Sequence, residues 1–285
     1  MNSQKEYWKK IYQSLEGSED DYILAINPDV KNHLNQFYQK QKIRSLNKLL
    51  KKCYNVEKNR VLDFGCGPGF FSNILYNKGA NVVGIDISEN LIKRNKSYYP
   101  FIEFEYLNSN HLSFNNETFD LVLSMMVLQH IEYQSQIKLI KEFSRTLKKG
   151  GYVIIVESIY EKDKNENIYS RSKMDWNQIF SDNGFTLVSM HGMEFMLLRR
   201  VYLLCRSFIS KMRYNKKENK NDFYNLESKQ IKTSLKKDDH SSVKFIFKQT
   251  IEFLITLLSY VVEPLSRLFL PSKLALRGAF LFKKL

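Results

Sequence analysis

Short apolar runs alternate with helix-like segments from about residue 60 to residue 193. Each run holds five or six residues, and the runs are Arg60–Phe64, Ala80–Ile85, Ile102–Tyr106, Phe119–Ser124, Tyr152–Glu157 and Phe185–Met190. Helix-like segments lie between most of them, at Phe70–Asn77, Glu89–Ser97, Gln136–Lys148 and Trp176–Asn183. We expect Gly150 and Gly151 to end the third of these helices. The alternation predicts an α/β fold with a doubly wound parallel sheet.

Two segments lie outside this alternation. Residues 1–58 have partial apolar stripes at helical spacing, and we expect them to cover one edge or the mouth of the sheet. Residues 199–242 begin with an apolar, basic run and continue as a Lys/Asn-rich stretch that is typical of a linker. Residues 243–270 have the pattern of an apolar helix broken by Pro264, and Gly278–Lys284 predicts one more strand.

The pattern therefore divides the chain into an N-terminal helical cap at 1–58, a core at 59–198 and a basic helical insertion at 199–285 that ends in the last core strand. Charge follows this division, since the net charge of +14 at pH 7 is not spread evenly. Residues 1–198 carry 25 Lys and Arg against 23 Asp and Glu, whereas residues 199–285 carry 19 against 7. This asymmetry predicts an acidic partner for the basic third, which is nucleic acid, an anionic membrane surface or a phosphorylated substrate.

Composition excludes several classes of protein. The three cysteines, Cys53, Cys66 and Cys205, form no CxxC pair, which excludes a disulfide scaffold or zinc ribbon and suits a reducing cytosol. The first residues have no apolar signal region. The most apolar stretch, Phe253–Val262, is about half as long as the ~20 residues of a membrane span. We expect a cytoplasmic protein with no bound metal.

The block at residues 61–88, VLDFGCGPGFFSNILYNKGANVVGIDIS, carries the most specific chemical signal. Gly65, Gly67 and Gly69 stand between a strand and a helix, where the backbone can turn tightly and approach a ligand. Asp86 ends the second strand, where an acid can accept hydrogen bonds from both hydroxyls of a ribose. The spacing is GxGxG rather than the GxGxxG of dinucleotide sites, and no phosphate-loop motif is present. Hydride transfer and nucleoside triphosphate chemistry are therefore disfavoured.

An acid two residues before the first glycine, Asp63, completes the motif DxGxGxG. The block resembles the S-adenosylmethionine site of class I methyltransferases of the small-molecule type, whose first motif is E/DxGxGxG. Residues 119–132, FDLVLSMMVLQHIE, are similar to the family's fourth strand and the segment after it. Residues 147–158, LKKGGYVIIVES, are similar to its fifth strand and the helix end before it. The resemblance implies a Rossmann-like sheet, mostly parallel with an antiparallel last strand, and S-adenosylmethionine as cofactor.

The resemblance also implies roles for single residues. Gly65 and Gly67 would meet the methionine part of the cofactor, and Asp63 would orient the turn and the ammonium group. Asp86 would bind the ribose hydroxyls, and Ile87 would pack on the adenine. The other cofactor-binding positions follow the third and fourth strands, and they are Asn108, Ser109, Ser124 and Met125. Asn108 stands where the family often has Asp, and an amide can still form hydrogen bonds there.

His130 is the candidate catalytic base, six residues after the fourth strand. The sulfonium group is already an activated electrophile, so the enzyme mainly aligns the acceptor, and a base helps when the acceptor is a hydroxyl. The competing interpretation is that His130 packs or caps a local helix. We expect His111 at the surface. Tyr7 and Trp8 either close the cofactor site or pack.

Some substrates are disfavoured by the residues that are missing. Ser124 to Val127 replace the [NDS]PPY motif of enzymes that methylate exocyclic amines of bases, and no cysteine stands where a cytosine-C5 enzyme needs one. Residues 199–285 fit an acceptor-binding insertion, a membrane-surface helix, a nucleic-acid surface or plain packing. The position before the last strand favours the acceptor insertion, with or without contact to an anionic membrane.

The sequence thus predicts a cytoplasmic methyltransferase, peripheral at the inner membrane surface if its acceptor is lipid-linked. The predicted acceptor is a hydroxyl of a small molecule or glycan, including phosphorylated or lipid-linked sugars. One alternative is an RNA or protein methyltransferase steered by the basic third. The other is a non-catalytic module that binds the cofactor.

Overall fold

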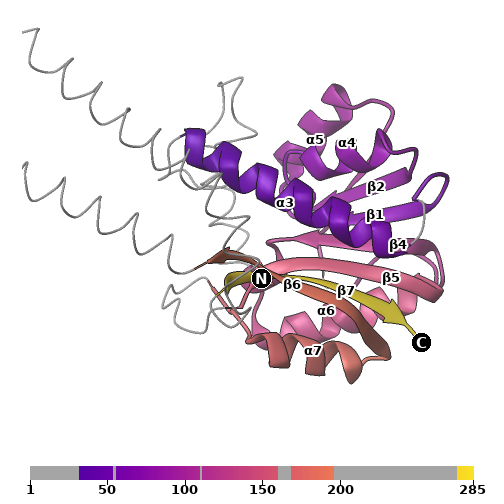
Figure 1. Cartoon of the computed structure of the whole chain (residues 1–285). Helices are drawn as coiled ribbons and strands as arrows, with labels where there is room; N and C mark the ends of the chain where they lie inside the picture. The colour runs from indigo at the N-terminus through magenta and orange to yellow at the C-terminus, as the bar shows by residue number, and fades with distance from the viewer. Residues whose placement is uncertain (1–31, 54–55, 110, 160–167, 196–274) are drawn as a thin grey trace, which may run out of the picture. The chain divides into compact units, whose positions relative to one another are not determined.

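A seven-stranded sheet forms the centre of the described chain (Figure 1). The computed structural model describes residues 32–53, 56–109, 111–159, 168–195 and 275–285. The strands are β1 (Arg60–Phe64), β2 (Asn81–Asp86), β3 (Glu103–Tyr106), β4 (Phe119–Met125), β5 (Leu147–Ser158), β6 (Phe185–Phe195) and β7 (Ala275–Lys284). Their order across the sheet is β3-β2-β1-β4-β5-β7-β6. Every strand that the apolar runs predict is present, although several have different ends.

Strands β3, β2, β1, β4 and β5 pair in parallel, and the last strand reverses direction. In the centre, Leu62 of β1 lies between Val83 of β2 and Val122 of β4. β7 runs antiparallel to β5 and places Leu281 beside Ile154. The prediction of a mostly parallel, Rossmann-like sheet with an antiparallel last strand is confirmed. Because parallel strands point the same way, their carboxyl ends meet at one edge, where ligands of such sheets bind.

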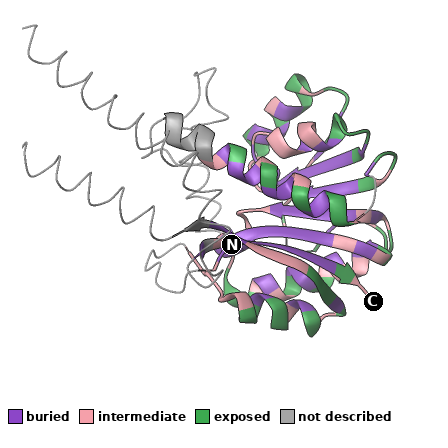
Figure 2. Ribbon diagram, in the orientation of Figure 1, coloured by how far each residue is buried: buried purple, intermediate pink, exposed green. Residues whose placement is uncertain are grey.

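Helices cover both faces of the sheet (Figure 1). They are α3 (Asn32–Cys53), α4 (Phe70–Tyr76), α5 (Glu89–Tyr98), α6 (Tyr133–Thr146) and α7 (Lys173–Ser181), with a short 3-10 helix, η1 (Leu128–His130). One apolar cluster joins α3, α4 and α5 to one face and includes Leu46 and Leu75. A second cluster joins α6 and α7 to the other face and includes Phe143 and Trp176. Figure 2 shows the buried residues gathered in the strands between these helices.

Helix α3 is the described part of the expected N-terminal cap. Its apolar residues Leu46, Leu49 and Leu50 are buried in the cluster that also holds Ile154 of β5 and Leu281 of β7. The helix therefore lies on a face of the sheet, not over its edge or mouth as the sequence analysis expected. The physical reason is that residues at this spacing form one apolar stripe, which is best buried against the flat apolar face of a sheet.

Helix α6 ends at Thr146 and not, as predicted, at Lys148 before the two glycines. Leu147 already belongs to β5, where it pairs with Phe119 of β4 and is fully buried. The regular register resumes only at Tyr152, so Gly150 and Gly151 form an irregularity inside the strand. Gly150 has a φ of 73°, which suits a bulge. Burial and pairing of Leu147 thus end the helix two residues before the predicted boundary.

Some expectations concern parts of the chain outside the described residues. These are residues 1–31 with Tyr7 and Trp8, the linker in 199–242, and the helix at 243–270 with Pro264. Of the helices that the structure describes, none combines the length and the apolar character that crossing a membrane requires.

Candidate functional site

The turn after β1 is built on glycines with left-handed backbone angles. Gly65, Gly67 and Gly69 have φ angles of 70°, 51° and 80°. Two N–H groups of the turn donate to the carbonyl of Ile85 in β2, at 2.8 and 2.9 Å. A Cβ atom on Gly65 would lie 2.5 Å from Cγ2 of Val127, so only glycine allows this close approach. The turn therefore joins the carboxyl ends of β1 and β2 to the segment after β4.

Asp63 supports this turn from within β1. Its side chain is buried, and its Oδ2 accepts a hydrogen bond of 2.6 Å from the hydroxyl of Ser72 in α4. Burial raises the pKa of Asp63 from 3.8 to about 7, opposed by the Ser72 hydrogen bond and reinforced by the charge of Asp86. Asp63 thus ties β1 to the helix after the turn. Its predicted contact with an ammonium group stays a prediction.

Asp86 holds the turn from β2. Its Oδ2 accepts the N–H of Gly67 and its Oδ1 accepts the N–H of Ser88, each at 2.9 Å. Burial raises the pKa of Asp86, and these N–H groups oppose the shift. Each carboxylate oxygen can accept a further hydrogen bond, so the group keeps the capacity to bind hydroxyls. The structure brings Asp86 and Gly67 together, and the predicted ribose contact of Asp86 stays a prediction.

Asn95 of α5 is a residue of this site that sequence reasoning missed. It is fully buried, and its Nδ2 donates to the carbonyl of Gly67 at 2.8 Å. Its Oδ1 has no hydrogen-bond partner among the described residues. Nearby, burial raises the pKa of the Cys66 thiol well above its usual value, which keeps it protonated and unreactive. The available signal was a polar residue on the apolar stripe of α5, beside Leu91 and Ile92.

The positions predicted around the adenine lie at the ends of β2 and β3. Ile87 is half-buried, and the N–H of Leu107 donates to the last carbonyl of β2 at 2.8 Å. Asn108 is exposed. The hydroxyl of Ser109 donates to the carbonyl of His111 at 3.0 Å and accepts its N–H at 3.2 Å, which closes a local turn. The cofactor contacts of Ile87, Asn108 and Ser109 stay predictions.

The end of β4 passes close to the glycine turn. Ser124 is fully buried, and its Oγ has no hydrogen-bond partner among the described residues. Met125 is half-buried beside it. Met126 has a φ of 64°, and its N–H donates to a carbonyl of β5 at 2.8 Å. A left-handed conformation costs a residue with a side chain about 1–2 kcal/mol, so this course is strained. The predicted residues Ser124 and Met125 therefore lie next to the turn, followed by a strained residue.

His130 ends η1 and is held by its neighbour Gln129. The Nε2 atoms of the two side chains lie 3.0 Å apart. Oε1 of Gln129 accepts the backbone N–H of Ser158 at 2.8 Å, which fixes the orientation of the amide. Gln129 must therefore donate to His130, so Nε2 of His130 is the acceptor and its proton lies on Nδ1. His130 can act as a base only when this hydrogen bond opens. Its catalytic role stays a prediction.

Glu157, at the end of β5, is a second residue that the sequence analysis did not assign. It is fully buried, and its carboxylate accepts the N–H groups of Val127, Leu128 and Gln129 at 3.2, 3.0 and 3.0 Å. Burial raises the pKa of Glu157 to about 8 against these three hydrogen bonds. The signal was present in the sequence, because an acid ends a buried apolar run here just as in the second strand.

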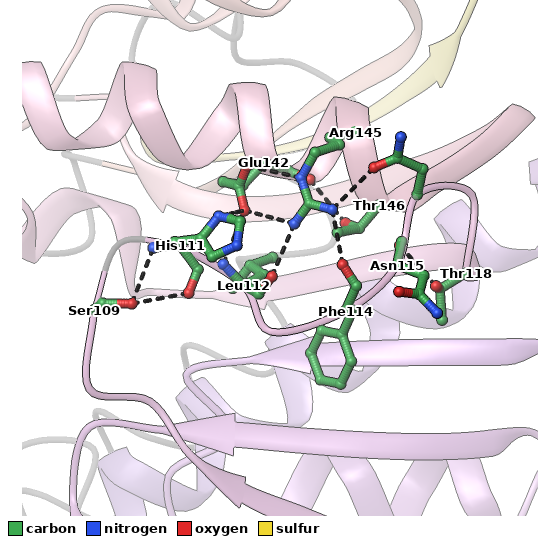
Figure 3. A network of polar contacts seen from close by, with 10 residues as sticks. Ser109, His111, Leu112, Phe114, Asn115, Thr118, Glu142, Arg145 and Thr146 are labelled. Atoms are coloured by element: carbon green, nitrogen blue, oxygen red, sulfur yellow. Dashed lines mark hydrogen bonds and ion pairs between the residues drawn. The ribbon is translucent and has the colours of Figure 1, made fainter.

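His111 belongs to a separate network in the loop before β4 (Figure 3). Its side chain is exposed, as expected, and its Nδ1 lies 2.9 Å from Glu142. Arg145 of α6 donates to Glu142 and to the carbonyls of Leu112 and Phe114, at 2.8, 2.8 and 2.7 Å. Hydrogen bonds from Arg145 lower the pKa of Glu142. This network anchors a loop on α6. Within the described part of the chain, no group of three or more His, Cys, Asp or Glu side chains could hold a metal ion.

Comparison with known proteins places this geometry in a family. A family profile described as "Methyltransferase domain" matches residues 62–155, which contain the glycine turn, Asp86 and the segment after β4. Residues 62–155 therefore form a methyltransferase domain, which supports the class I S-adenosylmethionine-dependent methyltransferase family. Members of this family are enzymes that use S-adenosylmethionine as methyl donor. The resemblance that the glycine block indicated is thereby confirmed.

Curated relatives match part of this methyltransferase chain. An uncharacterized protein of Methanocaldococcus jannaschii is 37% identical over 154 residues, 52% of this chain and 64% of its own length. Phosphoethanolamine N-methyltransferase 3 of Arabidopsis thaliana is 31% identical over 112 residues, 38% of this chain and 23% of its own. A ubiquinone biosynthesis O-methyltransferase of Aliivibrio fischeri is 28% identical over 130 residues, which are 44% of this chain and 54% of its own length. The match thus spans less than two-thirds of each relative.

A solved structure supports the fold over a longer stretch. A crystal structure from Galdieria sulphuraria, described as a candidate sarcosine dimethylglycine methyltransferase, matches 99% of this chain and 98% of its own with a TM-score of 0.56. Its sequence identity is 13%, so the likeness concerns the methyltransferase fold alone.

The residues of the methyltransferase site fit an adenosine cofactor with a cationic amino-acid end. Gly65 and Gly67 give the turn its left-handed backbone, and Asp86 keeps acceptor capacity for hydroxyls. The hydroxyl of Ser124 is buried with no partner among the described residues, which leaves it a donor for a ligand. Asp63 supplies a carboxyl group that a cation would ionise.

Proposed function

We propose that this chain transfers a methyl group from S-adenosylmethionine to a hydroxyl of a small molecule or glycan. One observation carries the donor half: Asp86 and the glycine turn meet through the Gly67 N–H at the carboxyl edge of the sheet. That contact places the buried carboxylate of Asp86, which can accept hydrogen bonds from hydroxyl groups, beside the glycine backbone of the turn. This arrangement suits a ligand in which a ribose is joined to an amino-acid end.

The donor would be held by residues at the carboxyl ends of β1 and β2. Gly65 and Gly67 would hold the methionine part, Asp86 the ribose and Ile87 the adenine. The bound cofactor supplies an activated methyl group on a sulfonium. Because a nearby cation lowers the pKa of a carboxyl group, we expect Asp63 to release its proton when the cofactor binds below pH 7.

The acceptor half rests on His130 and on the relatives. His130 holds a proton on Nδ1 and would orient a hydroxyl, and its Nε2 would become a base once Gln129 releases it. The ubiquinone biosynthesis relative is named an O-methyltransferase, which supports a hydroxyl. The relative named phosphoethanolamine N-methyltransferase makes a nitrogen acceptor the competing class. A phosphorylated or lipid-linked acceptor suits the basic residues 199–285.

Isothermal titration with S-adenosylmethionine tests the donor half. We expect the wild-type protein to bind, and Asp86→Asn to bind at least tenfold more weakly, since a charge-assisted hydrogen bond is worth about 1.5–3 kcal/mol. Asp182→Asn is the matched control, because Asp182 lies exposed at the end of α7, where its Oδ1 accepts from Gln178. Wild-type protein without affinity, or Asp86→Asn with full affinity, overturns the donor half.

Incubation with methyl-labelled cofactor tests the acceptor half. We expect label in glycan or small-molecule fractions of host extract, in a form that is stable as an ether. Label in RNA, with binding that weakens steeply as salt rises, would instead support the nucleic-acid alternative. Label in protein, or no transfer by cofactor-bound protein, would support the protein methyltransferase or the non-catalytic module.

We also propose that the protein works in the cytoplasm, in peripheral contact with the anionic inner membrane surface. The support is the excess of 19 basic over 7 acidic residues in 199–285. Flotation with anionic and neutral vesicles at low and high salt tests it. We expect binding to anionic vesicles at low salt only, and equal recovery with both vesicle types would contradict the proposal.

A further inference from the structure

The segment after β4, residues 125–131, contacts the cofactor turn at one end and carries His130 at the other. Met126 has a left-handed φ of 64°, and Val127 is the N-cap residue of η1. Val127 covers Gly65 so closely that a Cβ atom there would lie 2.5 Å away. A strained backbone persists only where the surroundings hold it. The contacts that hold this segment therefore decide the geometry of the site.

Glu157 supplies the contacts to the backbone N–H groups of this segment. The N–H groups of Val127, Leu128 and Gln129 are consecutive, and all three converge on its carboxylate at 3.0–3.2 Å. Glu157 is fully buried, where such hydrogen bonds are stronger than in water.

Gln136 of α6 holds the same segment by its carbonyl groups. Its Nε2 donates to the carbonyls of Leu128 and Ile131, both at 2.9 Å. Its Oε1 accepts from Nε of Arg171 at 2.6 Å, which fixes the amide in this orientation. The segment is thus held by a carboxylate from β5 on one side and by an amide from α6 on the other.

Gln129 carries this constraint to His130. Its backbone N–H binds Glu157, and its side-chain Oε1 binds the N–H of Ser158, the next residue of β5. Both ends of Gln129 are therefore fixed to the end of β5. Its remaining amide N–H groups point to Nε2 of His130 at 3.0 Å, which selects the tautomer with the proton on Nδ1.

We propose that Glu157 is a positioning residue of the methyl-transfer site, holding the segment after β4 in its strained course and, through Gln129, keeping the proton of His130 on Nδ1. The proposal rests on the proposed function, because it assigns His130 to the acceptor side of that site. Glu157 acts through the backbone it binds and exchanges no atom with cofactor or acceptor.

The first test uses wild-type protein with isotope-labelled histidine. The ring ¹⁵N and ¹³C signals of the five histidines report which nitrogen carries the proton, and comparison with His130→Gln assigns those of His130. We expect His130 with its proton on Nδ1 above its pKa. A proton on Nε2 would overturn the proposal, because Gln129 could then not donate to that atom.

The second test compares Glu157→Gln with Glu142→Gln. The amide of Glu157→Gln turns an N–H₂ group toward backbone N–H groups, so we expect His130 to become a mixture of tautomers and cofactor affinity to fall about tenfold. Glu142 also accepts a backbone N–H, from Leu112 at 2.8 Å, but lies in the His111 network and not on the segment 125–131. We expect Glu142→Gln to leave the tautomer of His130 unchanged. A His130 spectrum unchanged in Glu157→Gln overturns the proposal.

A further variant covers the case in which Glu157→Gln does not fold. Gln129→Met keeps the length of the side chain and removes both amide hydrogen bonds, so we expect the proton of His130 to shift toward Nε2. An unchanged tautomer in Gln129→Met overturns the proposal. The NMR measurement on the His130 ring needs neither cofactor nor acceptor. The proposed function and the positioning role of Glu157 can therefore fail separately. Wild-type protein that does not bind S-adenosylmethionine overturns the proposed function, while an unmoved His130 overturns the positioning role.

Discussion

Three buried acidic residues lie near the carboxyl ends of β1, β2 and β5. Burial raises the pKa of Asp63, Asp86 and Glu157 above their usual values. Each of them accepts hydrogen bonds from N–H or hydroxyl groups of the segments that surround the site. The same groups that shape the site should therefore make the stability of the protein depend on pH.

Asp63 offers the clearest test of this dependence. Its pKa is about 7 in the folded protein and 3.8 when unfolded, so between these values the unfolded chain has already lost a proton that the folded protein keeps. The contribution of Asp63 to the free energy of unfolding should therefore fall by an amount on the order of a few kcal/mol as pH rises from about 4 to 7, and it should stay level above pH 7. Urea unfolding between pH 4 and 9 measures it.

Asp63→Asn lacks this titration, so its free energy of unfolding should fall less between pH 4 and 7. Asp182→Asn serves as the control, because Asp182 is exposed at the end of α7. We expect the control to follow the wild-type curve. Parallel curves for wild type and Asp63→Asn would contradict the assigned pKa.

Substitutions of Gly65 and Gly184 by alanine can distinguish the cost of backbone strain from the cost of a steric clash. Both are left-handed, with φ angles of 70° and 83°. A Cβ atom on Gly184 has its nearest neighbour at 3.9 Å, whereas on Gly65 it meets Val127 at 2.5 Å. We expect Gly184→Ala to cost about 1–2 kcal/mol from backbone strain alone. Gly65→Ala should cost more and also weaken cofactor binding. Equal costs in urea unfolding would show that Val127 moves aside freely.

At the scale of elements, helix boundaries follow capping and burial. α7 begins with a capping box in which Ser172 Oγ accepts the N–H of Asp175 at 3.1 Å and Asp175 accepts the N–H of Ser172 at 3.2 Å. This start sets the direction in which Trp176 and Phe180 enter the core. The cap is therefore a small contact that supports two large buried side chains.

Ser172→Ala should lower the free energy of unfolding by about 1 kcal/mol, the usual value of an N-cap. Ser181→Ala, at the exposed last residue of α7, is the matched control and should change it by less than about 0.5 kcal/mol. Thermal unfolding monitored by circular dichroism measures both. A loss in Ser181→Ala as large as in Ser172→Ala would contradict the capping role.

Elements also show where local pattern and tertiary contacts compete. Apolar runs located every strand, because a strand buried on both faces needs continuous apolar residues. The glycine pair 150–151 was misread as a helix stop because Gly is typical of helix ends. In the folded chain the pairing of Leu147 with Phe119 ends α6 two residues earlier than predicted. That pairing joins residues far apart in the sequence, so no local pattern could reveal it.

At the scale of the molecule, β7 brings the C-terminal residues 275–284 back into the core next to β5. Phe282 is fully buried and stacks on Phe180 of α7, with ring centroids 4.1 Å apart. On the same strand, Lys283 is exposed. The last strand thus depends on contacts with segments about a hundred residues earlier in the chain.

Phe282→Ala should destabilise the protein by about 3–5 kcal/mol, since it leaves a cavity in a packed core. Lys283→Ala should change the free energy of unfolding by less than about 0.5 kcal/mol. Chemical denaturation followed by tryptophan fluorescence reports the loss directly, because Trp176 lies in the same apolar cluster. A cost for Phe282→Ala below that of a surface substitution would mean that β7 is not held by this packing.

The sequence by itself determined the α/β alternation, the glycine turn and the acid at the end of β2. Each of these is a local property, because periodicity records burial and glycine spacing records backbone angles. Tertiary structure alone decided that α3 lies on a face of the sheet, that Asn95 supports the turn and that Glu157 and Gln129 hold the segment of His130. These features join residues that are about 30 or more positions apart, or depend on the orientation of a single amide. Buried polar groups must find partners wherever the fold brings them, and only the folded chain defines those partners.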